Sequence, residues 1–181
     1  MALANILKWL AAVRGKRATP IAVRRARIFV AFAEYDVVIH RDAMSVYNFL
    51  LDPGHLPLWR DGVRSVELLS GAAGAKGAVY RQTIAGPGGR PVAADFEIIE
   101  ARTGAEIQYQ VIVGPARTRG GYYLSTEGPS TRVRFALNCE PRGFVIRMTH
   151  PFRRRMKAEV GQLERLKSLL EDMPAMEWTG W

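Results

Sequence analysis

The residue types that carry most enzymatic chemistry are sparse in this chain of 181 residues. Its histidines, His40, His55 and His150, lie far apart, and none has a histidine or cysteine partner at the spacing of metal ligands. No serine lies within a Gly-x-Ser-x-Gly nucleophile elbow. Cys139, the only cysteine, has no base beside it in the sequence, so we expect it to face the core of a strand. The sequence therefore predicts no metal site and no cofactor.

A glycine-rich segment and an arginine triplet are two candidate ligand sites. The segment Gly71–Gly77 superficially resembles a phosphate-binding loop, but it lacks the Gly-Lys-Ser/Thr ending and precedes a predicted strand. This placement favours a turn. Arg153, Arg154 and Arg155 either recognise an acidic group of a ligand or form a solvated face of a helix.

Four polar residues carry groups that could transfer protons to or from a bound substrate. A cyclase reaction needs a cavity that folds a reactive chain and one or two polar groups that move protons. Tyr80, Arg81, Gln82 and Tyr109 carry suitable groups, but nothing in their spacing singles them out. The sequence therefore leaves open whether the chain is an enzyme.

The clearest element that would position such groups is a long amphipathic helix near the C-terminus. Between Phe152 and Leu170 the apolar residues recur at intervals of three and four, which places them on one helical stripe. These residues are Phe152, Met156, Val160, Leu163, Leu166 and Leu170.

Segments with strand character precede this helix and are joined by turns that contain glycine or proline. They are Tyr35–Ile39, Val63–Leu69, Ala78–Ala85, Val92–Glu100, Glu106–Val113, Gly121–Ser125 and Arg132–Glu140. Two short helical segments follow the first of them: Ala43–Leu51, which Asp42 can cap, and a turn through Leu56, Pro57 and Trp59. Because no strand–helix unit repeats, we expect an α+β fold, in which a curved antiparallel sheet of about six to seven strands wraps around the C-terminal helix.

Short motifs along most of the chain share a family pattern. They are Ile39-His40, Val46–Leu50, the block Asp52–Trp59, Ser130–Val133, Glu140–Gly143 and Leu163–Lys167. Together they resemble the START-like superfamily and, within it, the polyketide cyclase/dehydrase and lipid-transport group. The resemblance covers roughly residues 33–172 and implies a helix-grip fold that encloses a cavity for an apolar small molecule. Family members include lipid carriers, hormone receptors and aromatase/cyclases, so the fold alone does not choose a function.

The predicted strands and helix offer one set of inward residues that would line such a cavity. We expect ligand contacts from Trp59, Tyr80, Gln82, Ile84, Phe96, Tyr109, Val111, Tyr122, Phe135, Met148, Phe152 and Met156. Apolar walls with a few hydroxyl and amide groups suit a small-molecule pocket, although the same side chains can also simply fill a core. Trp59 either stacks on a flat ligand at the cavity mouth or packs beneath the helix that Asp52-Pro53 ends.

The charge of the chain is concentrated in its first 32 residues. The net charge is +9, but residues 1–32 hold seven basic and no acidic residues, which leaves +2 for the rest. A nucleic-acid-binding domain carries its basic surface on the folded body, so we expect no nucleic-acid partner. The basic segment has the wrong residue order for a secretory signal. It is either a disordered tail, part of an over-long start whose product begins near Ala33, or an amphipathic helix that makes weak contact with an anionic membrane surface.

The sequence thus predicts one ligand-binding domain over residues 33–172, with a basic extension (1–32) and a short tail (173–181). The single cysteine fits a reducing, cytoplasmic compartment. The predicted function is binding of a lipid or polyketide-like small molecule in a cavity between the sheet and the C-terminal helix. The alternative is a polyketide-type cyclase, aromatase or dehydratase that acts in the same cavity. The oligomeric state stays undetermined.

Overall fold

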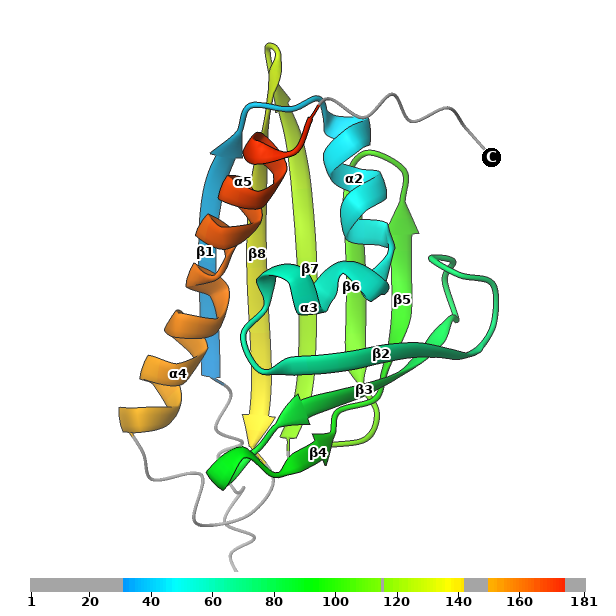
Figure 1. Ribbon diagram of the computed structural model, residues 1–181, viewed down its shortest axis with the longest axis vertical. Helices are drawn as coiled ribbons and strands as arrows, with labels where there is room; N and C mark the ends of the chain where they lie inside the picture. The colour runs from blue at the N-terminus through cyan, green and yellow to red at the C-terminus, as the bar shows by residue number, and fades with distance from the viewer. Residues whose placement is uncertain (1–30, 115, 142–149, 175–181) are drawn as a thin grey trace, which may run out of the picture.

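One antiparallel sheet and the helices on one of its faces make up the described part of the chain (Figure 1). The computed structural model describes residues 31–114, 116–141 and 150–174. The basic extension up to residue 30, including its proposed membrane contact, and the tail from 175 lie outside these residues. The elements are β1 (Ala31–Ile39), α2 (Ala43–Leu51), η2 (Pro53–His55), α3 (Leu56–Trp59), β2 (Val63–Ser70), β3 (Val79–Ala85), η3 (Pro87–Gly89), β4 (Pro91–Ala93), β5 (Phe96–Arg102), β6 (Glu106–Val111), β7 (Ala116–Glu127), β8 (Ser130–Pro141), α4 (His150–Gly161) and α5 (Leu163–Asp172).

The strand order confirms the predicted α+β helix-grip architecture. Among the described residues the eight strands pair in the order β1-β8-β7-β6-β5-β3-β2, and β4 pairs with β3. Every pair is antiparallel. In Figure 1, β2 and β3 cross the lower end of the upright strands, so the sheet curves around the face that carries the helices.

One predicted strand proved to be two. The segment Val92–Glu100 was expected to be continuous, but it divides into β4 and β5 at Ala94 and Asp95. Asp95 causes the break, because its carboxylate accepts from the Gln82 N–H (3.2 Å) and its carbonyl accepts from the Ile112 N–H (2.8 Å). These contacts leave Asp95 outside a regular ladder. The described sheet therefore has eight strands instead of six to seven.

The predicted C-terminal helix is present but bent. It is divided into α4 and α5 at Gln162, directly after Gly161, which is a weak helix former. Met156 and Val160 on α4 and Leu163, Leu166 and Leu170 on α5 are all buried against the sheet. The apolar stripe continues across the bend, which is why the sequence reads as one helix.

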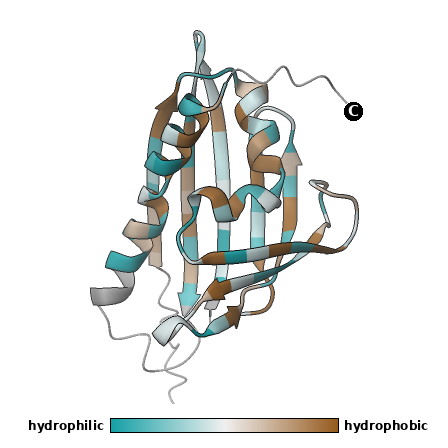
Figure 2. Cartoon of the chain, in the orientation of Figure 1, coloured by the Kyte–Doolittle hydropathy of each residue, from teal (hydrophilic) through white to brown (hydrophobic). Residues whose placement is uncertain are grey.

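The core lies between the sheet and these helices. On β8, Val133, Phe135, Leu137 and Cys139 are buried, whereas Arg134 and Asn138 between them are exposed. This is the alternation predicted from the sequence, and Figure 2 shows hydrophobic and hydrophilic bands alternating along the strands.

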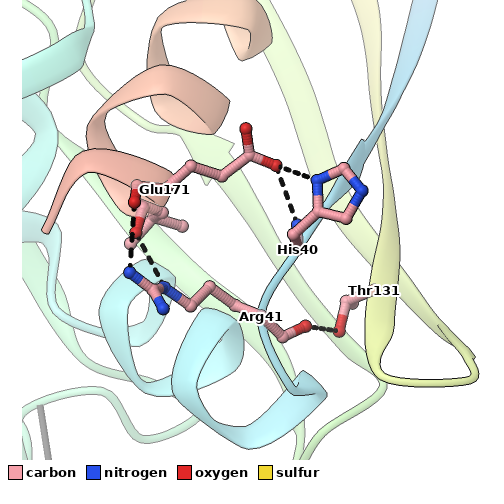
Figure 3. A network of polar contacts seen from close by, with 5 residues as sticks. His40, Arg41, Thr131 and Glu171 are labelled. Carbon is pink, nitrogen blue, oxygen red and sulfur yellow. Dashed lines mark hydrogen bonds and ion pairs between the residues drawn. The ribbon is translucent and has the colours of Figure 1, made fainter. Parts of the chain in front are cut away.

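The ends of α2 and α5 are fixed by side chains near the end of β1. The Asp42 carboxylate accepts from the Met44 and Ser45 N–H groups and so caps α2 (3.0 and 2.9 Å). Arg41 donates to the carbonyls of Leu170 (2.9 Å), Glu171 (3.2 Å) and Met173 at the end of α5. Figure 3 shows the Arg41 side chain beside Glu171. These contacts satisfy carbonyls that have no partner within the helix.

Candidate functional site

A row of aromatic side chains crosses five strands on the covered face of the sheet. We call it the aromatic row; it consists of Tyr80 (β3), Phe96 (β5), Tyr109 (β6), Tyr122 (β7) and Phe135 (β8). Neighbouring ring centroids lie 5.3, 5.6, 6.3 and 4.6 Å apart in that order. These separations are typical of interacting aromatic pairs. The row forms a continuous apolar floor beneath the helices.

A glycine leaves room for one ring of this row. Gly120 on β7 pairs with Tyr109 on β6. A Cβ atom at Gly120 would lie only 2.4 Å from both Cζ and Oη of Tyr109. The Tyr109 ring therefore lies across β7 in the space that any other residue at position 120 would fill. This places its hydroxyl at the cavity described next.

A small cavity lies between the aromatic row and the helices that follow β1. Its volume is about 30 Å³. The helix side is formed by Leu50 of α2, Pro53 of η2, Leu56 of α3 and Arg60 directly after α3. The sheet side is formed by Gln82, Phe96, Ile98, Ile107, Tyr109 and Tyr122. Among the lining residues that the structure describes, none belongs to α4 or α5, so this lining lies beside the C-terminal helix and not directly beneath it.

The block after α2 holds its apolar residues against this cavity. Asp52 ends α2, and its carboxylate accepts from the Gly54 N–H (2.8 Å). The His55 ring stacks on Phe49 at 4.3 Å, and its Nδ1 contacts the Phe49 carbonyl (2.9 Å). This tight turn buries Pro53 and Leu56. His55 is thereby engaged in holding the turn.

Arg60 is the most unusual residue of the lining. Its side chain is only 10% exposed, and one guanidinium nitrogen, Nη2, pairs with the Glu159 carboxylate of α4. The guanidinium carbon lies 5.5 Å from the centroid of the Phe135 ring, a cation–π contact. Among the described residues, Arg60 Nε and the Tyr122 hydroxyl are buried and make no hydrogen bond of normal geometry, although the Arg60 guanidinium lies close enough to Tyr109 and Tyr122 for these side chains to change its pKa. Buried polar groups nearly always have partners, so these two donors mark a site that something else can satisfy.

Burial and nearby side chains shift the pKa values of Tyr122 and Arg60. Burial raises the pKa of Tyr122, and the neighbouring Arg60 guanidinium opposes part of that rise. Burial alone would lower the pKa of Arg60, but Tyr109 and Tyr122 outweigh it and the net shift is upward. At neutral pH the cavity therefore presents a guanidinium cation beside a protonated Tyr122 hydroxyl.

Polar contacts tie the segment after α3 to the bend in the C-terminal helix. We call them the clasp: the Arg60–Glu159 ion pair, the Asp61 N–H donating to Gln162 Oε1 (2.8 Å), and the Asp61–Arg165 ion pair. Arg165 and Asp61 are both exposed, so their pair contributes little stability by itself. Through its ion pair with Glu159, the clasp holds Arg60, a residue of the cavity lining, against α4.

The residues expected to contact a ligand fall into three groups. Gln82, Phe96, Tyr109 and Tyr122 line the cavity. Trp59, Tyr80, Phe135 and Met156 are buried in the surrounding core, while Ile84 and Val111 are half-buried. Met148 and the side chain of Phe152 lie outside the described residues. Trp59 packs edge-on against Tyr122 at 6.1 Å, the packed position considered above.

Of the four candidate proton carriers, two line the cavity and two do not. Gln82 and Tyr109 reach the cavity. The Tyr80 hydroxyl accepts instead from the Gly74 N–H (2.7 Å), which shows that Gly71–Gly77 folds as a turn over β3. Arg81 is exposed. Only two of the four are therefore placed to meet a ligand in the cavity.

Sequence reasoning missed the helix side of the cavity. Leu50, Pro53, Leu56 and Arg60 form that side and were not among the expected contacts, and neither were Ile98 and Ile107 on the sheet side. Pro53 and Leu56 lie in the block Asp52–Trp59 that carries the family resemblance, so that block contained the signal. The sequence around Arg60, which follows Trp59, contains no pattern that predicts burial of this arginine.

The structure gives less support to the other candidate sites. Within the described ranges, no group of three or more His, Cys, Asp or Glu side chains is placed to hold a metal ion. Cys139 is buried beside Thr118 Oγ1 (3.1 Å), and burial raises the pKa of its thiol. Arg154 and Arg155 are exposed. No helix in the described part of the chain is long and apolar enough to cross a membrane.

A second hollow of about 280 Å³ lies at the other end of the helices. It is lined by residues around the α2 N-terminus and the α5 C-terminus, among them His40, Arg41 and Met173. Its polar groups are already engaged: His40 Nδ1 contacts Glu171 (2.7 Å), and the Thr131 hydroxyl donates to the Arg41 carbonyl (2.8 Å; Figure 3). These contacts fix the ends of the helices.

Comparison with known proteins agrees with this fold. The family model described as polyketide cyclase/dehydrase and lipid transport matches residues 32–171. None of the curated proteins matches the chain.

Solved structures share the fold at low sequence identity. Major latex-like protein 151 from Panax ginseng is 14% identical, with a TM-score of 0.62 over 77% of this chain and 97% of that protein. A START superfamily protein from Mycobacterium smegmatis is 16% identical, with a TM-score of 0.60 over 77% of this chain and 94% of that protein. The di-domain ARO/CYC StfQ from the steffimycin biosynthetic pathway is 13% identical, with a TM-score of 0.65 over 81% of this chain and 52% of StfQ. These likenesses establish a START-like fold, and the sequence match shows that the chain belongs to the polyketide cyclase/dehydrase and lipid-transport family.

Proposed function

We propose that the chain binds a hydrophobic or amphipathic small molecule, a lipid or polyketide-like compound, in the cavity between the aromatic row and α2–α3. The observation that carries this proposal is the lining: aliphatic and aromatic walls that surround two buried donors without partners, Arg60 Nε and the Tyr122 hydroxyl. Small-molecule sites typically combine apolar walls with a few convergent polar groups. Membership of a family whose described activities include lipid transport supports the same function.

Ligand entry requires the cavity to widen. Its volume of about 30 Å³ holds roughly two water molecules, far less than the several hundred Å³ of a typical ligand pocket. We infer that the helix side moves, because α3 is only four residues long. Its displacement requires the clasp, which joins the segment after α3 to the C-terminal helix, to open. In this proposal, displacement of α3 widens the cavity.

Native mass spectrometry of the protein purified from its own host tests the proposal. Extraction and identification of any bound compound should accompany it. We expect a stoichiometric apolar or amphipathic compound that is lost on denaturation. Protein that carries no such mass, and that acquires none when incubated with an extract of host lipids and small molecules, would contradict the proposal.

A polyketide-type cyclase, aromatase or dehydratase is the second candidate, and the donors in the cavity favour it. Arg60 and Tyr122 would stabilise the negative charge that develops on an enolate oxygen, while the cavity folds the reactive chain. A pure carrier does not need groups that act in this way.

Product analysis separates the two candidates. A synthetic poly-β-ketone chain is incubated with the wild-type protein and with Tyr122→Phe, and the products are resolved by mass spectrometry. An enzyme should produce a cyclised or dehydrated product faster than the spontaneous reaction, with a large loss of rate in Tyr122→Phe. A wild-type rate equal to the background would exclude cyclase activity toward that chain.

A further inference from the structure

The polar groups of the cavity gather at one end of it. Arg60 and Tyr122 both lie against the Phe135 ring, with the Arg60 guanidinium carbon 5.5 Å and the Tyr122 ring centroid 4.6 Å from its centroid. The Tyr109 ring lies next to Tyr122, at 6.3 Å. The Tyr122 side chain is 3% exposed and the Arg60 side chain 10%. The rest of the lining is aliphatic or aromatic, apart from Gln82. The cavity therefore has a polar end and an apolar body.

This polar end offers hydrogen-bond donors and a positive charge. The cavity lining contains one arginine and no acidic residue. The Arg60–Glu159 pair occupies one nitrogen of the guanidinium, Nη2, and leaves the buried Nε without a partner. A guanidinium presents its donors in a planar fork that matches the two oxygens of a carboxylate. The carboxylate already bound to Arg60 shows that this side chain pairs with such a group in its buried position.

We propose that the cavity recognises the carboxylate, or an equivalent oxyanion, of an otherwise apolar ligand through Arg60 Nε and the Tyr122 hydroxyl. The proposal rests on the proposed binding function and deepens it by naming the ligand class: amphipathic acids with one anionic group and an aromatic or aliphatic body. The body lies on the aromatic row. The anion supplies the acceptor that both buried donors lack.

Burial makes this recognition selective. Hydrogen bonds between ionised groups are stronger than those between neutral groups, and they strengthen further where water is excluded. Tyr122 stays protonated at neutral pH because its pKa is raised, so its hydroxyl donates to the anion. A neutral ligand of the same shape fills the apolar body but forms weaker hydrogen bonds at the polar end.

Isothermal titration calorimetry with two matched probes tests the proposal. The probes are 2-naphthoate and 2-naphthamide, which share the aromatic body and differ in charge at the head group. We expect the wild-type protein to bind 2-naphthoate at least about tenfold more tightly, the ratio expected of one charge-assisted hydrogen bond. This comparison needs no variant, so it holds even where a substitution impairs folding.

Variants then assign the preference to residues. Arg60→Met and Tyr122→Phe should each lower the affinity for 2-naphthoate and leave that for 2-naphthamide within about twofold. Arg119→Met is the matched control, because Arg119 is exposed on the same strand as Tyr122. It removes the same charge and should keep the preference for the acid. Circular dichroism confirms that each variant is folded.

The outcomes distinguish failure of anion recognition from failure of ligand binding itself. Saturable binding of both probes with equal affinity, or a preference for the acid that survives in Arg60→Met, would overturn the recognition of an anion and leave the cavity as a general apolar site. Failure of both probes to bind the wild-type protein would overturn the binding function as well. A preference for the acid that disappears in Arg60→Met and remains in Arg119→Met would support the proposal.

Discussion

Replacing Gly120 by alanine adds one methyl group and tests where the Tyr109 ring lies in the cavity wall. In Gly120→Ala the new Cβ would lie 2.4 Å from Cζ and 2.6 Å from Cε1 of Tyr109, closer than carbon atoms approach in proteins. The Tyr109 ring has neighbours on both sides in Phe96 and Tyr122, at 5.6 and 6.3 Å, so it cannot move without disturbing the aromatic row. Overpacking of this kind costs about 1–3 kcal/mol, and replacing a strand glycine returns about 0.5–1 kcal/mol. The middle values of these ranges give an expected net loss of about 1 kcal/mol in the free energy of unfolding.

Urea denaturation of a double-mutant cycle measures this effect. The cycle combines Gly120→Ala with Tyr109→Leu, whose shorter side chain removes the clash. The double mutant should then be more stable than the sum of the single effects predicts, by about 1 kcal/mol or more. Gly161→Ala is the control, because no atom lies within 4 Å of a Cβ there, and it should stabilise the protein by about 0.5–1 kcal/mol. Strictly additive effects, or a Gly120→Ala variant as stable as the wild type, would refute the placement of Tyr109 across β7.

Further substitutions test the core, the cavity and the cap of α2. Leu166→Ala should cost about 2–5 kcal/mol in thermal or urea unfolding, because this fully buried leucine joins α5 to the sheet; a loss below about 1 kcal/mol would show that α5 is not packed as described. Tyr122→Phe should leave stability unchanged or raise it by about 1 kcal/mol, since it removes a buried hydroxyl that has no partner; clear destabilisation would indicate a hydrogen bond that the structure lacks. Asp42→Ala should cost about 0.5–2 kcal/mol at pH 7 through loss of the α2 cap. Hydrogen bonds from Ser45 lower the pKa of Asp42 below its ordinary value of 3.8, so the ionised cap stabilises the fold above that pH and its contribution is lost as the pH falls further. The stability difference between wild type and Asp42→Ala should therefore shrink below about pH 3.8, and a constant difference down to pH 2 would contradict this assignment.

The fold was largely predictable because its signals are periodic and local. The alternation of Val133, Phe135 and Leu137 indicated a half-buried strand, and the stripe from Met156 to Leu170 indicated a helix that packs on a sheet. The break between β4 and β5 was not predictable in the same way. It depends on Asp95 contacting Gln82 and Ile112, and those contacts exist only once the sheet has formed.

The cavity was predictable on its sheet side and not on its helix side. Inward alternation placed Gln82, Phe96, Tyr109 and Tyr122 on one face, and the structure keeps them together. Arg60 has no such pattern, because its burial depends on Glu159, which lies 99 residues away in the sequence. A charged residue that is buried by a distant partner looks like an ordinary surface residue when only its sequence neighbours are considered.

Two leucines of α3 allow the central claim, a ligand in the cavity beside this helix, to be tested directly. Leu56 lines the cavity and is 8% exposed, whereas Leu58 in the same helix is 59% exposed. The measurement is a fluorescence titration of the wild type, Leu56→Phe and Leu58→Phe with the neutral apolar probe N-phenyl-1-naphthylamine. We expect saturable binding to the wild type and to Leu58→Phe. Leu56→Phe should bind the probe at least about tenfold more weakly, because the larger ring occupies the space that the ligand needs. Equal affinities in all three proteins, or no saturable binding to the wild type, would contradict the central claim.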